Sequence, residues 1–172
     1  MKETTKTNKK NYSKAITVGI CIVIIAALIV AAAIFYPSIR ARHALRDITD
    51  HIKGSGIKSA TVHAPSNGNN VFDESGNEHI ATEDELARLK DLILKITDGA
   101  EYSSSDSEEI LFDYEYRIRF RIESGEALGF FFTDGKFYIA NDGVRYFFIS
   151  GDESAYLELI SLAKSLTEPE NH

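Results

Sequence analysis

The sequence has a single cysteine, Cys21, so no disulfide bond can form within the chain. It also lacks a phosphate-binding glycine loop and a paired-cysteine metal motif. The five histidines are scattered, without a spacing that would bring several of them to one metal ion. These absences predict a non-enzymatic protein that uses no metal or cofactor and whose folded part is stabilised by packing alone.

Acidic residues are scarce in residues 1–14, whereas in residues 37–172 the basic residues are outnumbered by acidic ones. Residues 1–14 contain five lysines and one glutamate, and residues 15–36 contain no charge. The other 14 of the 19 Lys and Arg, and 25 of the 26 Asp and Glu, lie in residues 37–172. This acidic balance argues against binding of nucleic acid or anionic lipid headgroups through net charge. Residues 1–14 have no apolar periodicity and are expected to be disordered.

Residues 15–36 form an apolar run of 22 residues, and a helix that spans a bilayer needs about 20. The lysines before the run predict a cytoplasmic N-terminus and an extracytoplasmic C-terminal domain. Arg40, Arg42 and Arg46 on the far side argue for the opposite orientation. A cleaved secretory signal is the alternative, because alanines 31–33 are acceptable to a signal peptidase. The run is longer than a signal core of about 7–15 residues, which favours an uncleaved single-pass anchor.

Residues 37–56 are predicted to form a juxtamembrane helix and linker. Pro37 should kink or end the membrane helix. Ser38 to Lys53 then shows helical periodicity, and Gly54 to Gly56 should end this second helix. Its apolar face consists of Ala41, Ala44, Leu45, Ile48 and Ile52.

Residues 57–172 are predicted to form one extracytoplasmic domain. Residues 57–63 favour a strand, residues 71–72 begin a second short strand, and residues 75–77 favour a turn. Thr82 and Glu85 match a capping box before a helix that Asp98 and Gly99 should end. Residues 101–109 are expected to form an acidic, solvated loop. Ser150 and Glu153 match a capping box before a second amphipathic helix.

The strongest strand pattern covers residues 110–122, in which apolar side chains, Tyr114 among them, alternate with polar ones. A three-residue loop at residues 123–125 would pair Ile118 with Phe130. Asp134 and Gly135 favour a type I′ turn, and residues 141–143 favour a third turn. The expected fold is therefore α+β, with a four-stranded antiparallel meander packed against two amphipathic helices in two layers. The register aligns Phe120 with Leu128, Phe132 with Phe137 and Phe130 with Ile139.

The polar face of this meander is the candidate binding surface, because arginines stacked over aromatic rings can bind anionic or peptide ligands. The pattern favours the other interpretation, in which residues 38–80 cover the aromatic rings while the arginines pair with Asp113, Glu115 and Glu123. The candidate residues are Arg117, Arg119, Arg121, Phe131, Tyr138 and Phe147.

Two further segments do not support a site. Residues 73–78 contain several acids but lack the ligand spacing and glycine position of a calcium loop. Residues 103–107 are rich in serine but have no partnering histidine, so nucleophilic catalysis has no support.

Five motifs carry a family resemblance over most of residues 57–166, namely IKSATV, IATEDELARLKDLILKI, YEYRIRF, TDGKFYI and DESAYLELI. With these motifs, the chain resembles a small uncharacterised extracytoplasmic domain of Gram-positive lipoproteins and single-pass membrane proteins. That resemblance implies an α+β domain and no activity.

A second resemblance concerns the N-terminus. Residues 14–18 (KAITV) look like the processing site of a type IV pilin-like precursor, and Pro37 falls where such proteins often kink their long helix. Ala15 replaces the usual glycine, and Ile20 stands where the characteristic glutamate is expected. The sequence thus favours a membrane-anchored domain that binds an envelope or membrane protein or a ligand, with a pilin-like structural subunit as the alternative.

Overall fold

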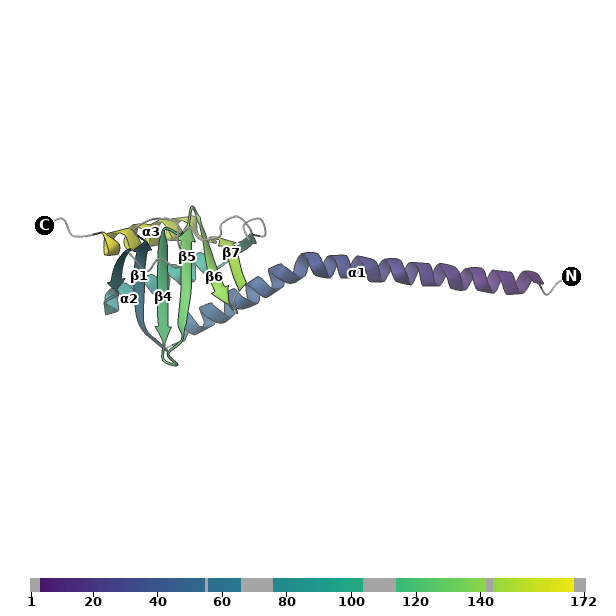
Figure 1. Cartoon of the computed structure of the whole chain (residues 1–172), viewed down its shortest axis with the longest axis horizontal. Helices are drawn as coiled ribbons and strands as arrows, with labels where there is room; N and C mark the ends of the chain where they lie inside the picture. The colour runs from purple at the N-terminus through teal and green to yellow at the C-terminus, as the bar shows by residue number, and fades with distance from the viewer. Residues whose placement is uncertain (1–3, 55, 66–75, 104–113, 142–143, 169–172) are drawn as a thin grey trace. The chain divides into compact units, whose positions relative to one another are not determined.

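The computed structural model describes residues 4–54, 56–65, 76–103, 114–141 and 144–168 (Figure 1). The chain divides into two compact units, Met1–Arg40 and Ala41–His172. The helices are α1 (Thr4–Lys53), α2 (Glu83–Thr97) and α3 (Glu153–Thr167). The strands are β1 (Ile57–Pro65), β2 (Gly76–Ile80), β3 (Glu101–Ser103), β4 (Tyr116–Ile122), β5 (Ala127–Thr133), β6 (Lys136–Asn141) and β7 (Val144–Ile149).

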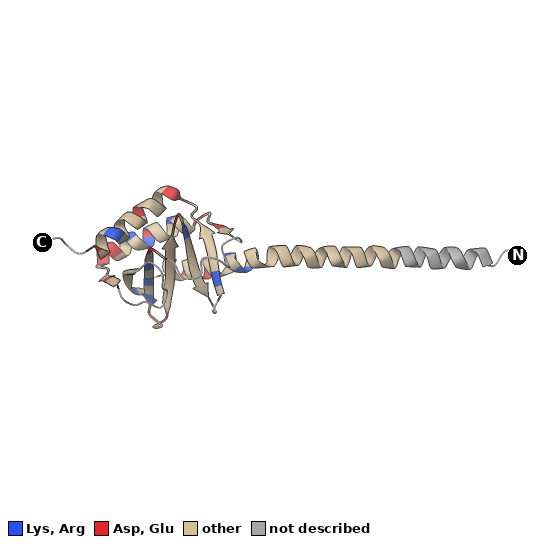
Figure 2. Cartoon of the chain, turned by 45° about the horizontal axis from the view of Figure 1, so that its top comes forward, with Lys and Arg blue, Asp and Glu red and all other residues tan. Residues whose placement is uncertain are grey.

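The first unit is helical from Thr4 onward, and the large apolar side chains that the structure describes in it are exposed. One uninterrupted helix long and apolar enough to cross a membrane lies within residues 17–53. Residues 17–39 carry no charge, and the large apolar side chains from Val18 to Phe35 are more than half exposed (Figure 2). Such a surface is compatible with a membrane anchor or a signal sequence, because water-exposed apolar area on this scale is unfavourable.

Two expectations about this helix are corrected. Pro37 lies inside α1, so it does not end the helix, and Ser38 to Lys53 continues the same element. Residues from Thr4 onward are helical as well, although residues 1–14 were expected to be disordered. Lysine is a good helix former, and extending a helix costs far less than nucleating one, so the apolar segment can propagate the helix in both directions.

Within the described residues, the sheet of the second unit has seven antiparallel strands, in the order β2-β1-β4-β5-β6-β7-β3. The predicted four-stranded meander is present as β4 to β7, so four strands was too few. β1 pairs with the outer edge of β4, and β3 pairs with the outer edge of β7. These added strands cover edges that would otherwise expose unpaired backbone groups. Gly76 and Asn77, expected in a turn, belong to β2, and residues 101–103, expected in a loop, form β3.

The predicted hairpin register is confirmed. Ile118 pairs with Phe130, and Gly125 adopts the left-handed conformation (φ +92°) that the three-residue loop requires. The pairs Phe120–Leu128, Phe132–Phe137 and Phe130–Ile139 also form as expected. β4 starts at Tyr116, however, so the strand is shorter than predicted, and residues 110–113, 71–72 and 142–143 lie outside the described residues.

One face of the sheet packs against helices to form the main core. Two helices were predicted to cover it, and the structure has α2, α3 and the last turns of α1 there. The predicted face of α1 is buried, with Ala41 and Ile52 fully inaccessible. The sheet contributes Ala60, Val62, Ile118, Phe120, Phe130, Phe132, Phe137, Ile139, Tyr146 and Phe148 to this core.

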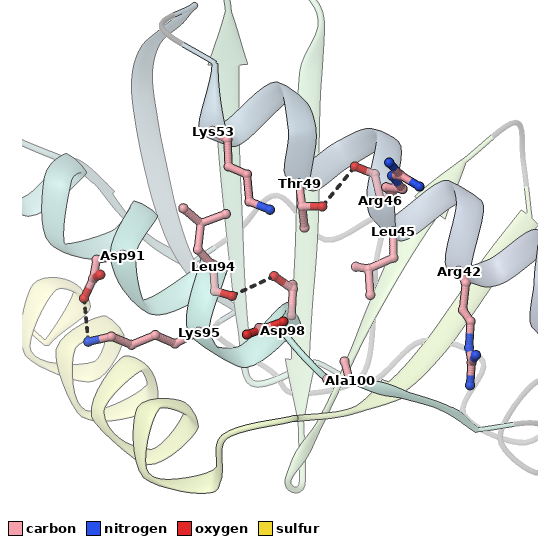
Figure 3. A pocket seen from close by; sticks show the side chains of 12 residues that line it. Arg42, Leu45, Arg46, Thr49, Lys53, Asp91, Leu94, Lys95, Asp98 and Ala100 are labelled. Atoms are coloured by element: carbon pink, nitrogen blue, oxygen red, sulfur yellow. Dashed lines mark hydrogen bonds and ion pairs between the residues drawn. The ribbon is translucent and has the colours of Figure 1, made fainter.

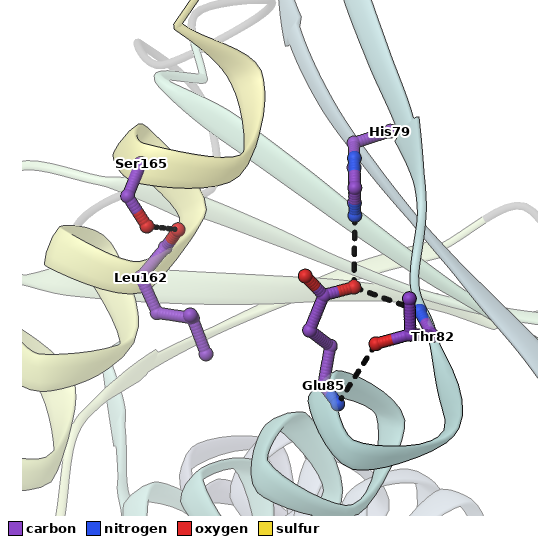
Figure 4. Close-up of polar contacts among 5 residues, drawn as sticks. All are labelled: His79, Thr82, Glu85, Leu162 and Ser165. Atoms are coloured by element: carbon purple, nitrogen blue, oxygen red, sulfur yellow. Dashed lines mark hydrogen bonds and ion pairs between the residues drawn. The ribbon is translucent and has the colours of Figure 1, made fainter. Parts of the chain in front are cut away.

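The start of α2 confirms the predicted capping box and adds a histidine to it (Figure 4). The Thr82 hydroxyl accepts from the Glu85 amide at 3.4 Å, and Glu85 Oε2 accepts from the Thr82 amide at 2.7 Å. The same oxygen lies 2.9 Å from His79 Nε2 of β2. The box predicted for α3 is wrong: Asp152, not Ser150, is the N-cap, and its carboxylate accepts from the Ala155 amide.

The His79–Glu85 contact predicts a pH dependence of stability. The hydrogen bond from His79, followed by that from the Thr82 amide, holds the pKa of Glu85 below its ordinary value of 4.5. A lowered folded-state pKa stabilises the fold above pH 4.5, and this contribution is lost as the pH falls through the folded-state pKa. We expect Glu85→Gln to reduce the loss of stability between neutral pH and pH 3, measured by urea unfolding.

The matched control is Glu83→Gln, which removes an exposed acid from the same turn. Glu85→Gln should lose less stability than Glu83→Gln in this acid range. At neutral pH, Glu85→Gln should cost about 1 kcal/mol or less, because the amide can still accept a hydrogen bond in the cap. Equal slopes for wild type and Glu85→Gln would contradict the assignment.

Candidate functional site

The face of the sheet away from the helices carries a continuous cross-strand row of polar and aromatic residues. Each member is the direct partner of the next, so the row crosses all seven strands. Strand pairing therefore brings four of the six predicted site residues into one line. From β2 to β3 the row consists of Glu78, His63, Arg117, Phe131, Tyr138, Phe147 and Ser103.

The aromatic members of the row form a second cluster, separate from the main core. Phe131 and Tyr138 stack with ring centroids 4.5 Å apart and an interplanar angle of 2°. Phe147 lies 5.0 Å beyond Tyr138, and the guanidinium carbon of Arg145 lies 5.9 Å from the Tyr138 ring centre. Tyr138 and Phe147 are almost fully buried, so this cluster holds the face rigid rather than offering open rings.

Tyr114 joins this second cluster, although the alternating pattern placed it on the core face. Its ring meets Phe131 edge-on at 5.4 Å, and its hydroxyl lies 3.1 Å from His63 Nδ1. The prediction is wrong because β4 begins only at Tyr116, so the two-residue alternation does not extend back to Tyr114.

Arg117 is a buried cation without a carboxylate partner among the described residues. The residue is 9% exposed, and its Nε atom has no hydrogen-bond partner among the described residues. The guanidinium carbon lies 6.0 Å from the centre of the Tyr114 ring, an arrangement that stabilises a cation through the ring electrons. A buried charge without an opposite charge is costly and favours any anion that approaches it.

Arg119 and Arg121 lie on the same face but outside the aromatic row. Their cross-strand neighbours are small: Thr61 and Gly129 flank Arg119, and Ser59 and Ala127 flank Arg121. Both arginines are exposed, and neither forms an ion pair with a described residue. The arginine groove, a cavity of about 320 Å³, is lined by Ser59, Thr61, Glu78, Ile80, Arg119 and Arg121.

The described part of residues 38–80 does not cover this face, whereas residues 55 and 66–75 of the same segment lie outside the described residues. The end of α1 packs into the main core on the opposite face, and β1 and β2 extend the sheet instead of covering it. No ion pair joins the three arginines to Glu115 or Glu123 within the described residues. Asp113 lies outside them.

Metal binding has no geometric basis in the described ranges, where no group of three or more His, Cys, Asp or Glu could hold an ion. Residues 73–75 of the acidic segment and residues 104–107 of the serine-rich segment lie outside those ranges. Comparison of the chain with protein-family models, with curated proteins and with solved structures finds no match.

Three members of this face are not among the residues predicted from the sequence: His63, Tyr114 and Arg145. His63 meets Arg117 only because β1 pairs with β4, and more than 50 residues separate the two in the chain. Arg145 reaches the Tyr138 ring from β7. The period-2 pattern of β7 could have placed Arg145 beside Phe147 on the polar face, whereas no local pattern indicates the β1–β4 pairing.

Proposed function

We propose that this protein is a single-pass membrane-anchored binding domain without enzymatic activity. Residues 15–36 would span the bilayer, residues 1–14 would be cytoplasmic, and residues 57–172 would be extracytoplasmic. The domain would bind an acidic, extended segment of an envelope or membrane protein through the arginine groove. The observation that carries this proposal is a set of three arginines on one sheet face, none of which has an ion-pair partner within the described residues.

The geometry of the groove supports an extended acidic ligand. Arg119 and Arg121 are alternate residues of one strand, so their Cα atoms are about 6.6 Å apart. Alternate side chains of a bound extended peptide have the same spacing, which lets two carboxylates face two guanidinium groups. The side chains of Ser59 and Thr61, which also line the arginine groove, provide hydroxyl donors. Buried Arg117, one row away, adds positive potential.

The test uses the full chain in phosphatidylcholine nanodiscs and a fluorescein-labelled peptide in which glutamate alternates with valine. Fluorescence anisotropy should show saturable binding that Arg119→Ala/Arg121→Ala weakens at least tenfold, about 1.4 kcal/mol. A peptide with lysine in place of glutamate should not bind. Arg42→Ala/Lys53→Ala removes two exposed charges elsewhere on the domain and should leave the affinity unchanged.

Loss of binding in both double variants would indicate a general charge effect and contradict the groove assignment. A second double variant, Arg119→Ala/Phe131→Ala, replaces one residue of the arginine groove and one residue of the aromatic row. This pair should also abolish capture of the peptide, and unchanged capture would remove the face from consideration.

A pilin-like subunit is the second candidate, favoured by the continuity of α1 from the apolar segment through Pro37 to Lys53. N-terminal sequencing of the mature protein distinguishes the possibilities. A start at Met1 supports the anchor, a start at Ile16 supports pilin-type processing, and a start near Ile34 supports a secreted domain. Arg119→Ala/Arg121→Ala should not alter this processing.

A further inference from the structure

The arginine groove has a second wall, formed by β2, which the proposed function does not use. β1 lies between β4 and β2 in the sheet, and residues that pair directly on neighbouring strands share a face. Arg119 is the partner of Thr61, and Thr61 is in turn the partner of Ile80. Glu78 lies two residues before Ile80 on the same face and also lines the groove. Two side chains of β2 therefore face the arginines of β4 across β1.

The two walls differ in chemistry. The β4 wall carries two guanidinium groups, whereas the β2 wall carries one carboxylate and one apolar side chain. Glu78 is exposed and forms no ion pair with any residue that the structure describes. Ile80 is 72% exposed, more than any other large apolar side chain within the described ranges. The β2 wall thus offers a negative charge and an apolar surface to a ligand.

The width of the groove fits one extended chain. Adjacent strands are about 4.8 Å apart, so the Cα atoms of the two walls are about 9.6 Å apart. An extended backbone lying over β1 is then about one strand spacing from each wall, measured along the sheet. Its successive side chains point in opposite directions, so alternate residues face the arginines and the residues between them face β2.

The register of the strands places each ligand side chain. When the first and third residues of a bound segment face Arg121 and Arg119, the second and fourth face β2. Ile80 is level with Arg119, and Glu78 is about 6.6 Å further from Arg121 along the strands. At about 3.3 Å per residue, the second ligand residue lies near Ile80, and the fourth lies between Ile80 and Glu78.

The fourth position favours a basic side chain. Like charges on neighbouring strands destabilise their pairing and opposite charges stabilise it, so Glu78 disfavours another acid there. A lysine or arginine can place its charged head at the Glu78 carboxylate while its methylene groups cover Ile80. The second position requires only an apolar side chain that contacts Ile80.

We propose that the arginine groove selects a segment of mixed charge, in which acid, apolar, acid and basic residues follow one another. Arg119 and Arg121 bind the two acids, and Glu78 is the specificity-determining residue that selects the basic one. The pattern applies in either chain direction, because it depends only on which side of the backbone each side chain occupies. This inference rests on the proposed function, since it requires an extended ligand whose acids face the arginines.

The test compares two fluorescein-labelled peptides on the full chain in phosphatidylcholine nanodiscs at low ionic strength. The first peptide alternates glutamate with valine over eight residues, and the second has lysine in place of one central valine. Glutamates flank this lysine on both sides, so it can lie beside Glu78 in either chain direction. Fluorescence anisotropy should show that the wild type binds the lysine peptide about threefold more tightly, the size expected for one exposed ion pair.

Substitutions of Glu78 separate its effect from that of overall charge. Glu78→Gln should bind the two peptides equally, and Glu78→Lys should prefer a peptide with glutamate in place of the same valine. The matched control is Asp98→Asn, which also removes one exposed acid. Asp98 lines a separate cavity of about 500 Å³ between the end of α1 and the end of α2 (Figure 3). This control should keep the wild-type preference for lysine.

The outcomes distinguish this inference from the proposed function. A preference for lysine that Glu78→Gln removes and Asp98→Asn keeps supports the inference. Equal binding of the two peptides by the wild type, or a preference that Glu78→Gln keeps, overturns it and leaves arginine-dependent binding intact. If Arg119→Ala/Arg121→Ala binds both peptides as tightly as the wild type, the proposed function fails, and this inference fails with it.

Discussion

Arg117→Met is expected to raise the free energy of unfolding by about 2 kcal/mol while it weakens binding of the glutamate–valine peptide several-fold. Arg117 is 9% exposed and has no ion pair with a described residue, so the folded state bears the cost of a desolvated charge. Methionine has a similar length, removes the charge and keeps a favourable contact with the Tyr114 ring. Urea unfolding and peptide anisotropy on the same preparation measure the two effects.

Arg119→Met is the matched control, because Arg119 lies two residues along β4 on the same face but is exposed. Its unfolding free energy should change by less than about 0.5 kcal/mol, whereas its peptide affinity should fall more than that of Arg117→Met. A loss of stability in Arg117→Met would show that the buried cation stabilises the fold, and would contradict the view that it is retained for binding.

Gly151→Ala is expected to destabilise the domain by about 3 kcal/mol. Gly151 lies between β7 and α3, where its amide donates to the carbonyl of Ile96 at 3.0 Å. A Cβ atom there would overlap the carbonyl oxygen of Asp98 and lie 2.9 Å from the carbonyl carbon of Gly99. These are backbone atoms, so the strain cannot be relieved by rotation of a side chain. Thermal unfolding and urea titration measure the loss.

Gly99→Ala separates this effect of space from an effect of conformation. Gly99 belongs to the same junction but adopts φ +70°, and a Cβ atom there would meet open space. Its substitution should cost only the penalty of the left-handed conformation, about 1 kcal/mol. If Gly151→Ala costs no more than Gly99→Ala, the close approach of the Gly151 and Asp98 backbones is not a constraint on the fold.

Local patterns in the sequence were sufficient for the elements that form between neighbouring segments. The register of β4 to β6 followed from alternating side chains and from glycine at Gly125 and Gly135, because a hairpin joins strands adjacent in the chain. The cap of α2 followed from Thr82 and Glu85 for the same reason. The cap of α3 did not, since Ser150 and Asp152 are both good caps two residues apart, and the Asp152 carboxylate is the group that accepts from the Ala155 amide.

The pairing of strands that are distant in the chain could not be predicted from local sequence patterns. β1 and β3 join the sheet through partners distant in the chain, and the β1–β4 pairing brings His63 beside Arg117. The candidate face was correct in its alternation of Arg117, Arg119 and Arg121. The three arginines differ in burial, however. Arg117 is buried in the aromatic row, whereas the other two arginines line the open arginine groove. The three arginines occupy equivalent positions in the local sequence pattern. Which of them is buried depends on the neighbouring strands, and a local pattern contains no information about those strands.

The sequence by itself determined an apolar helix of membrane-spanning length, an α+β class and a glycine-directed hairpin series, because each depends on side-chain periodicity over a few residues. Tertiary structure alone decided that the sheet has seven strands and that the end of α1 enters the main core. It also placed Glu78 and Ile80 of β2 at one groove with the arginines of β4. These features follow from the burial of apolar faces from distant segments against one another, which no single segment specifies.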